Sequence, residues 1–279
     1  MLSPAQVARF QEDGYLVIPD FKSKQEIAGL RARAAQIVEA FDPDAGKSIF
    51  TTRDQEKQVD RFFLDSANRV SCFFEEEAFG ADGQLQQAKA LSINKIGHAL
   101  HDLDPVFLAF SRDERLASVA DDLGLREVQV WQSMYIFKQP GIGGEVRWHQ
   151  DATYFDTSPI SVTTFWFALE DATLENGCLW AEPGGHRTPL RERYVREGDQ
   201  VSMEKLDSTP WPGDATAVPL EARTGSLVVF HGLLPHYSAP NRSAISRHAD
   251  TRHATEGRTA YSKRNWIQRG ADLPVRGFR

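Results

Sequence analysis

The sequence predicts a mainly β protein with flanking α-helices, in which an antiparallel double-sheet barrel is buttressed by helices from the N-terminal part of the chain. Helical patterns dominate the early part of the 279 residues. From Val128 onward, short runs rich in Val, Thr, Phe, Tyr and Trp are separated by Gly, Pro and Asn. No repeat or linker divides the chain, so we expect one domain over residues 1–279.

The N-terminal elements have clear local signals. Ser3 is suited to cap a helix whose third position is Gln6, and Gly14 is suited to end it. The buried-strand pattern of 15–18 follows, and apolar residues at helical spacing predict a second helix over 24–41.

The next segment, 42–90, is polar and broken. We expect a long excursion with one hairpin over 61–75 and mobility near 42–57. Two helices are predicted after it, over 93–110 and 114–123.

The strands of the barrel are expected in the β-rich runs that follow. These runs are 128–139, 145–155, 162–172, 178–185, 225–232, 236–241 and 258–267. Loops around a rigid barrel carry recognition, so we expect substrate specificity in 42–90 and in the loop 190–217.

Composition and charge exclude several classes of protein. The chain is 41% hydrophobic and 25% charged, with a formal net charge of -7. There is no basic surplus of the kind that binds nucleic acid or anionic membranes, so the expected partner is a small-molecule substrate. A local group of arginines could serve an anionic substrate or be a solvated charged segment: Arg187, Arg191, Arg193 and Arg196.

Targeting signals and disulfides are not expected. Two cysteines, Cys72 and Cys178, are too few for a disulfide framework or a cysteine metal site, and they fit a reducing compartment. The N-terminus has no basic stretch followed by an apolar core, and no apolar run reaches the length of a membrane helix. We therefore expect a cytoplasmic protein.

A metal site is predicted around His149 and Asp151. Residues two apart on a strand point to the same face, so both side chains can enter the barrel while Gln150 points away. A later segment supplies the third ligand, and it contains His231 and His236, of which His236 begins the next strand. Two imidazoles and one carboxylate form the facial triad of non-haem Fe(II) oxygenases, which leaves positions open for a co-substrate and dioxygen.

Arg247 follows His236 by eleven residues. Its planar guanidinium can hold the carboxylate of a dicarboxylic co-substrate, and this favours an oxygenase that uses iron and 2-oxoglutarate. A zinc hydrolase is the rival class, but the HExxH pattern that such enzymes usually carry is absent. A jelly-roll binding protein that retains a metal site without catalysis is the other alternative.

Several ordered motifs resemble one known family. WHQDATYF, EDATLENGCLW, PGGH and HYSAPNRSAISRHA are similar to the phytanoyl-CoA dioxygenase (PhyH) family. SINKIGHALHDLDPVF and QSMYIFKQPGIGGEV resemble its phytanoyl-CoA dioxygenase domain-containing proteins. The resemblance extends from DGYLVIPDF to about Ala249, and it implies a double-stranded β-helix, or jelly roll, that uses Fe(II), 2-oxoglutarate and O2.

The resemblance also implies roles for individual residues. His149, Asp151 and His236 match the iron ligands, which form the catalytic centre. Arg247 and Ser238 match the groups that bind the distal carboxylate of 2-oxoglutarate. Three further residues match positions that line the co-substrate pocket: Lys95, Met134 and Trp166.

The implied reaction is hydroxylation of a small organic molecule, with release of succinate and CO2. Related halogenases replace the metal-binding carboxylate with a small residue, so the presence of Asp151 favours hydroxylation. The substrate stays open between an acyl-CoA and a secondary metabolite.

Other residues are given minor roles. We expect packing or surface roles for His98 and His101, which lie three apart in a predicted helix, and a structural role for His186. Gln132 shares a strand face with Met134 and could point into the pocket.

Overall fold

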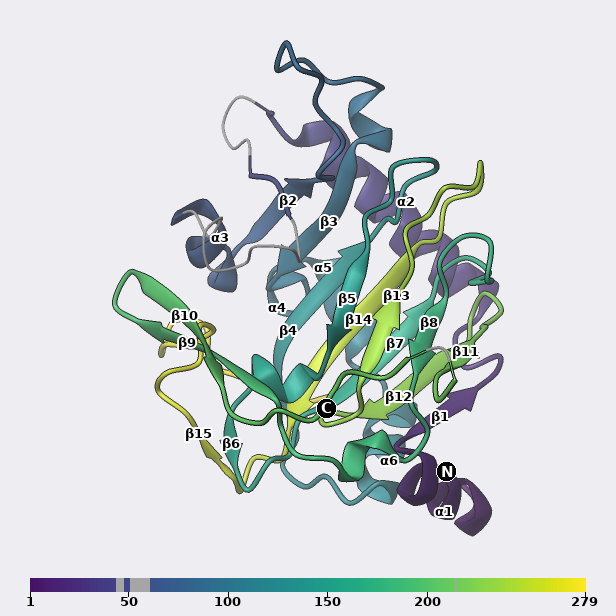
Figure 1. Cartoon of the computed structure of the whole chain (residues 1–279), viewed down its shortest axis with the longest axis vertical. Coiled ribbons are helices and arrows are strands. Elements are labelled where there is room, and N and C mark those ends of the chain that lie inside the picture. Colours follow the sequence, from purple (N-terminus) through teal and green to yellow (C-terminus); the bar gives the residue numbers. More distant parts are fainter. Residues whose placement is uncertain (44–47, 51–60, 214) are drawn as a thin grey trace.

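The computed structural model describes residues 1–43, 48–50, 61–213 and 215–279, and its core consists of two facing antiparallel sheets (Figure 1). The larger sheet contains, in spatial order, β1 (Tyr15–Ile18), β12 (Leu227–His231), β7 (Thr163–Ala168), β14 (Ala249–Thr255), β4 (Gln129–Ile136), β3 (Ile93–His98) and β2 (Val70–Phe74). The smaller sheet contains β11 (Val218–Leu220), β8 (Leu179–Ala181), β13 (His236–Ser238) and β5 (Val146–His149). The mainly β, double-sheet prediction is confirmed.

Two strand pairs lie outside these sheets. They are β9 (Glu192–Glu197) with β10 (Gln200–Lys205), and β6 (Thr157–Ser158) with β15 (Ala260–Tyr261). The β9–β10 hairpin projects from the barrel on the side where β15 and β6 lie (Figure 1).

Helices cover the outer face of the larger sheet (Figure 1). They are α1 (Pro4–Asp13), α2 (Lys24–Ala40), α4 (Leu100–Leu103), α5 (Pro105–Ser111) and α6 (Glu114–Asp122). The remaining helix, α3 (Arg61–Asp65), lies on the inner side, where its Phe63 side chain lines the space between the sheets. Strand alternation separates the two faces of β7: Phe165 and Phe167 pack in the core with α2, α5 and α6, whereas Trp166 packs between the sheets. Burial of each of the fully buried phenylalanines in this layer stabilises the fold by roughly 2–3 kcal/mol.

The first two helices begin where the sequence predicts. Ser3 accepts a hydrogen bond from the Gln6 amide, the Gln6 side chain accepts one from the Ser3 amide, and Gly14 caps the C-terminus with φ 82°. The second helix has the same reciprocal cap, made by Ser23 and Glu26.

The predicted helix over 93–110 is wrong in its first part. Residues 93–98 form β3, which pairs with β2 on one side and β4 on the other. Only 100–103 and 105–111 are helical. The apolar spacing of Ile93 and Ile96 fits either structure, and pairing with two strands from other parts of the chain decided the outcome.

The segment before β3 and two later strands also differ from expectation. The predicted hairpin over 61–75 is instead α3, a short turn and β2, whose strand partner is β3. Most of the predicted mobile stretch 42–57 lies outside the described residues. The loop expected over 190–217 contains the β9–β10 hairpin, and β14 was not predicted.

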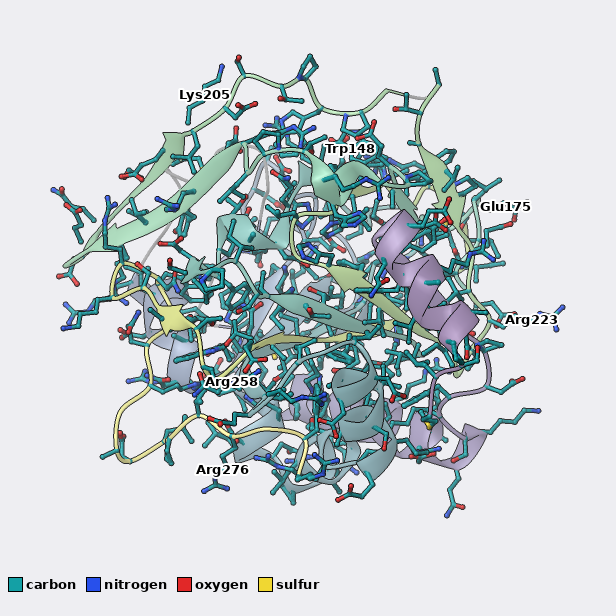
Figure 2. All side chains as sticks on the ribbon, turned by 90° about the horizontal axis from the view of Figure 1, so that it is seen from below. Trp148, Glu175, Lys205, Arg223, Arg258 and Arg276 are labelled. Carbon is teal, nitrogen blue, oxygen red and sulfur yellow. The ribbon has the colours of Figure 1, made fainter. Side chains whose placement is uncertain are left out.

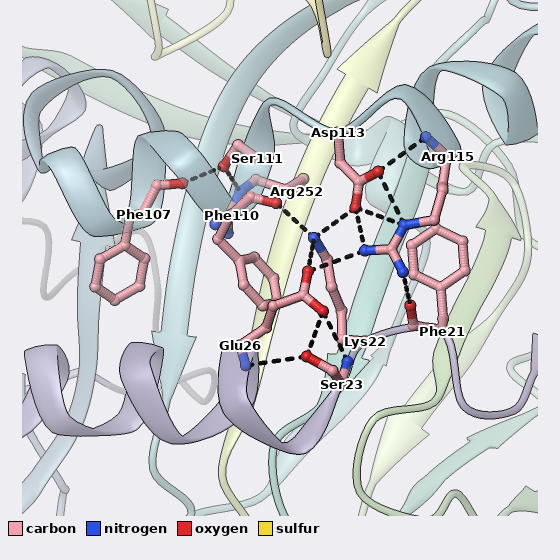
Figure 3. Close-up of polar contacts among 10 residues, drawn as sticks. All are labelled: Phe21, Lys22, Ser23, Glu26, Phe107, Phe110, Ser111, Asp113, Arg115 and Arg252. Atoms are coloured by element: carbon pink, nitrogen blue, oxygen red, sulfur yellow. Dashed lines mark hydrogen bonds and ion pairs between the residues drawn. The ribbon is translucent and has the colours of Figure 1, made fainter.

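The buried ammonium of Lys22 links three helices of the outer layer (Figure 3). The ammonium of Lys22, whose side chain is 1% exposed, donates to Glu26 at 3.2 Å, to Asp113 at 2.7 Å and to the Phe110 carbonyl at 3.0 Å. Arg115 donates to both carboxylates as well. These contacts hold the start of α2 against α5 and α6.

Replacing Lys22 with methionine is expected to lower the free energy of unfolding by about 3 kcal/mol, because two carboxylates lose a buried partner. Urea unfolding at pH 7 measures this change. Lys24→Met, on an exposed neighbour, is the matched control and should stay within about 0.5 kcal/mol of wild type. An equal effect in both variants would contradict a specific role for the buried ammonium.

The same cluster predicts how stability depends on pH. Burial alone would raise the pKa of Glu26, but hydrogen bonds from Ser23 and the charge of Lys22 lower that pKa to about 2. A carboxyl with a lowered folded-state pKa stabilises the fold above its ordinary pKa, so this contribution is lost as the pH falls from about 4.5 towards 2. The decrease in stability with falling pH should be less steep in Lys22→Met.

In the described part of the chain, no helix combines the length and apolar character needed to cross a membrane.

Candidate metal centre and co-substrate pocket

A cavity of about 480 Å³ lies between the two sheets. Side chains from β4, β7 and β14 line one wall, and side chains from β5, β8 and β13 line the other. The structure brings all eight predicted site residues to this cavity: Lys95, Met134, His149, Asp151, Trp166, His236, Ser238 and Arg247.

The three predicted metal ligands form a compact group. His149 ends β5 and His236 begins β13, and these strands pair so that the two residues lie opposite each other. One ligand atom from each histidine and one from Asp151 all lie within 4.8 Å of one another. The Asp151 Oδ1 atom is 3.5 Å from His149 Nε2 and 3.7 Å from His236 Nε2.

The local backbone differs from the predicted strand. β5 ends at His149, and Asp151 begins a short 3-10 turn, Asp151–Thr153. Gln150 lies outside the metal-binding group, as predicted, although it is buried and not solvated. Its amide nitrogen donates to the carbonyls of Pro189 and Leu233 at 3.1 and 2.9 Å. Gln150 therefore fixes the backbone beneath the centre.

Further hydrogen bonds orient the ligands. Nδ1 of His149 lies 2.8 Å from the Arg147 carbonyl, and Nδ1 of His236 lies 3.0 Å from the Leu234 carbonyl. A carbonyl only accepts, so both rings carry their proton on Nδ1 and leave Nε2 free for a metal. The Thr164 hydroxyl donates to Asp151 Oδ2.

The electrostatics favour the protonation states that bind a metal. Burial opposes ionisation of Asp151, but the adjacent His236 and His253 imidazoles hold its pKa well below the ordinary value. Burial lowers the pKa of His236 to about 4. At neutral pH the group therefore offers a carboxylate and a neutral imidazole, and no ligand proton has to be displaced. This donor set fits Fe(II).

A buried arginine forms the floor of the cavity. Arg247 is 1% exposed and donates through Nε to the Gly177 carbonyl at 3.1 Å and through Nη2 to the Ser238 hydroxyl at 3.1 Å. Its Nη1 atom is buried and has no hydrogen-bond partner among the residues that the structure describes. The guanidinium lies 5.6 Å from the Trp166 ring, and burial lowers its pKa to about 10. A carboxylate from a ligand would satisfy Nη1.

Lys95 is a second buried cation in this wall. Its Nζ atom lies 3.9 Å from Met134 Sδ and 3.1 Å from the centre of the Phe50 ring. Burial lowers the pKa of Lys95 to about 7. Among the described residues, neither Lys95 nor Arg247 has a carboxylate within ion-pair distance. Two unpaired buried cations suit a dianion such as 2-oxoglutarate.

Sequence reasoning missed His253. Its Nε2 atom is 3.6 Å from Asp151 Oδ1, its ring stacks on Phe155, and its Nδ1 atom has no partner. The signal was alternation along the chain after Arg247, which places Thr251 and His253 on the inner face. The polar sequence of β14, ADTRHAT, does not predict a strand, and without a strand the alternation has no meaning.

The remaining histidines lie outside the metal-binding group. His98 belongs to β3 and not to a helix, and its Nδ1 atom bonds the Ser66 hydroxyl at 2.8 Å. His101 bonds the Ser133 hydroxyl. His231 accepts a hydrogen bond from the Leu233 amide, so the group contains His236 and not His231. Packing roles fit His98 and His101.

Comparison with known proteins identifies relatives over nearly the whole chain. A plant protein named phytanoyl-CoA dioxygenase (Arabidopsis thaliana) is 47% identical over 274 residues, covering 98% of this chain and 95% of that protein. The phytanoyl-CoA dioxygenase domain-containing protein 1 of Bos taurus is 41% identical and covers 98% of this chain and 97% of its own.

The fold has solved counterparts. The epimerase SnoN, crystallised with Fe3+, alpha ketoglutarate and nogalamycin RO, aligns with a TM-score of 0.64 at 16% identity, covering 99% of this chain and 98% of its own. The jelly-roll fold predicted from the sequence is confirmed, and the His–Asp–His group provides a donor set consistent with the predicted Fe(II).

The match to the family model is equally extensive. The model for phytanoyl-CoA dioxygenase (PhyH) matches residues 10–249, which contain every residue of the metal-binding group and the cavity floor. The chain therefore belongs to the phytanoyl-CoA dioxygenase (PhyH) family.

Proposed function

We propose that this oxygenase hydroxylates a small organic molecule and converts 2-oxoglutarate to succinate and CO2. The observation that carries the proposal is one cavity holding both the His–Asp–His group and a buried arginine with an unpartnered Nη1 atom. O2 is the oxidant, and one of its oxygen atoms enters the product while the other enters succinate. Fe(II) and 2-oxoglutarate, when bound, would activate it, and the protein supplies position and electrostatics.

The chain's own residues divide this work. His149, Asp151 and His236 would hold the metal through the atoms that face one another. Arg247 and Ser238 would bind the distal carboxylate of the co-substrate. The carboxylate of Asp151 would also take the coordination position that chloride needs, which favours transfer of a hydroxyl group over transfer of chloride.

The structure favours a free small molecule over a CoA thioester. The local group of arginines at 187, 191, 193 and 196 forms no continuous basic patch, because each side chain has its own partners. Arg191 is 2% exposed and donates to two backbone carbonyls, and Arg187 and Arg196 also donate to carbonyls. Arg193 pairs with Asp156 at 3.2 Å. Four other exposed basic side chains lie apart from one another in Figure 2: Lys205, Arg223, Arg258 and Arg276.

A CoA thioester is the second candidate substrate, because the Arabidopsis relative is named a phytanoyl-CoA dioxygenase. Both segments in which we expected specificity reach the cavity, through residues such as Phe63, Tyr194 and Trp211. Aromatic walls suit an apolar substrate body in either case.

The decisive experiment follows substrate oxidation and succinate together. Purified protein with Fe(II) and 2-oxoglutarate is incubated with metabolite pools and, separately, with phytanoyl-CoA, and products are read by mass spectrometry. We expect a free small molecule to gain one oxygen in step with succinate release. Oxidation of phytanoyl-CoA alone would favour the thioester.

Other outcomes would reject the proposal. An Fe(II)-dependent product of unchanged mass would indicate an isomerisation in place of hydroxylation, as the name of the epimerase SnoN illustrates for this fold. Tightly bound zinc with no response to 2-oxoglutarate would indicate a hydrolase. Bound iron without oxygen uptake in any pool would indicate a binding protein.

A further inference from the structure

The inner face of the larger sheet carries two rows of residues at different depths. Strand register places three residues of β4, β14 and β7 side by side in each row. The row nearer the floor is Met134, Thr251 and Trp166, and the next row is Gln132, His253 and Thr164.

The second row lies at the level of the metal centre. The Thr164 hydroxyl donates to Asp151, and His253 Nε2 lies 3.6 Å from the same carboxylate. Register partners on adjacent strands have Cβ atoms roughly 5 Å apart, so Gln132 is beside His253 at this depth. Arg247 and Ser238 belong to the deeper floor, where the co-substrate carboxylate is expected.

Gln132 has polar atoms that the fold does not satisfy. Its side chain lines the cavity and is 5% exposed. Within the described ranges, its carboxamide makes no hydrogen bond with another side chain or with the backbone. The carboxamide therefore faces the cavity without a protein partner, and a ligand that displaces water from the cavity would have to supply one.

The surroundings of Gln132 indicate what else the ligand contains. Phe63 and Trp266 line the same cavity and stack with ring centres 4.7 Å apart. Phe155 also lines it, and its ring is stacked on His253 at 4.9 Å. These rings provide an apolar chamber next to one neutral donor and acceptor.

We propose that Gln132 recognises an uncharged hydroxyl or amide group of the organic substrate, while Phe63, Phe155 and Trp266 hold its apolar body. This inference rests on the proposed function, which assigns the floor to 2-oxoglutarate. The substrate group that Gln132 recognises is uncharged, because a neutral carboxamide cannot compensate a buried charge. A carboxamide both donates and accepts, so it can pair with either group.

The test measures binding of two matched probes to protein loaded with Zn(II), which replaces Fe(II), and 2-oxoglutarate. Benzamide and toluene differ only by a carboxamide in place of a methyl group, and ligand-observed NMR gives their dissociation constants. Wild type should prefer benzamide, and Gln132→Leu should reduce that preference about tenfold, as expected for one lost hydrogen bond. Gln132→Met provides a second apolar variant if the first does not fold.

Thr251→Val is the matched control. It removes a buried hydroxyl that also lacks a partner, one row closer to the floor, and it should keep the benzamide preference. A preference that persists in both Gln132 variants, or that is absent from wild type, would overturn the role of Gln132. Calorimetry with 2-oxoglutarate separates the two proposals: failure of the wild type to bind it would overturn the proposed function itself.

Discussion

Replacing Asp151 with alanine is expected to abolish iron binding and 2-oxoglutarate turnover. Asp151 contributes the only carboxylate of the metal-binding group in the described structure, and its Oδ1 atom faces both histidine Nε2 atoms. Without it, the two imidazoles remain with no anion to compensate Fe(II). Turnover, followed as succinate, should fall more than about a hundredfold, since loss of an outer partner alone costs 10–100-fold.

Thr164→Val is the graded control for that variant. It leaves the carboxylate in place and removes the hydroxyl that donates to Oδ2, so turnover should fall by about tenfold and iron should still bind. Iron content is measured on each protein after anaerobic loading. Stoichiometric iron and wild-type succinate formation in Asp151→Ala would refute the metal centre.

Replacing Arg247 with alanine is expected to raise the 2-oxoglutarate concentration needed for half-maximal turnover by about a hundredfold. Loss of one partner from a buried, hydrogen-bonded charge pair costs 2–5 kcal/mol, and about 3 kcal/mol corresponds to that factor. Arg247→Lys should recover only part of the affinity, because an ammonium cannot replace the planar fork that holds Ser238 and a carboxylate together.

Arg252→Met is the matched control for the arginine. Arg252 is equally buried but lies on the opposite face of β14, where it pairs with Asp250 at 2.5 Å and donates to the Ser111 hydroxyl. This variant should lose stability without a change in the 2-oxoglutarate requirement. A similar rise in that requirement for Arg252→Met and Arg247→Ala would show that the effect comes from the fold and not from the cavity floor.

Local signals in the sequence predicted the first helices and the sites of several strands. The caps at Ser3 and Ser23 depend on hydrogen bonds that span three residues, so they form wherever the chain turns into a helix. Strand composition likewise located β4, β7 and β12. Most side chains of these strands are buried, on both faces of the sheet.

Elements defined by distant partners were not predictable in this way. β3 has an apolar pattern that also fits a helix, and it is a strand because β2 and β4 flank it. β14 has the largely polar sequence ADTRHAT, yet all seven of its residues are buried. Its polar side chains are tolerated because Arg252 and Asp250 pair on one face, while Thr251 and His253 line the cavity on the other.

The sequence by itself determined the chemical inventory of this protein: a His-X-Asp triplet, a later histidine, a serine and an arginine in an order typical of its family. Residue types and their spacing carry that information. Only the tertiary structure decided that Arg247 and His253 carry buried nitrogen atoms without a hydrogen-bond partner among the described residues, and that Gln132 and His253 line the same cavity. The reason is physical, because desolvation and unmet hydrogen bonds depend on which distant segments enclose a side chain.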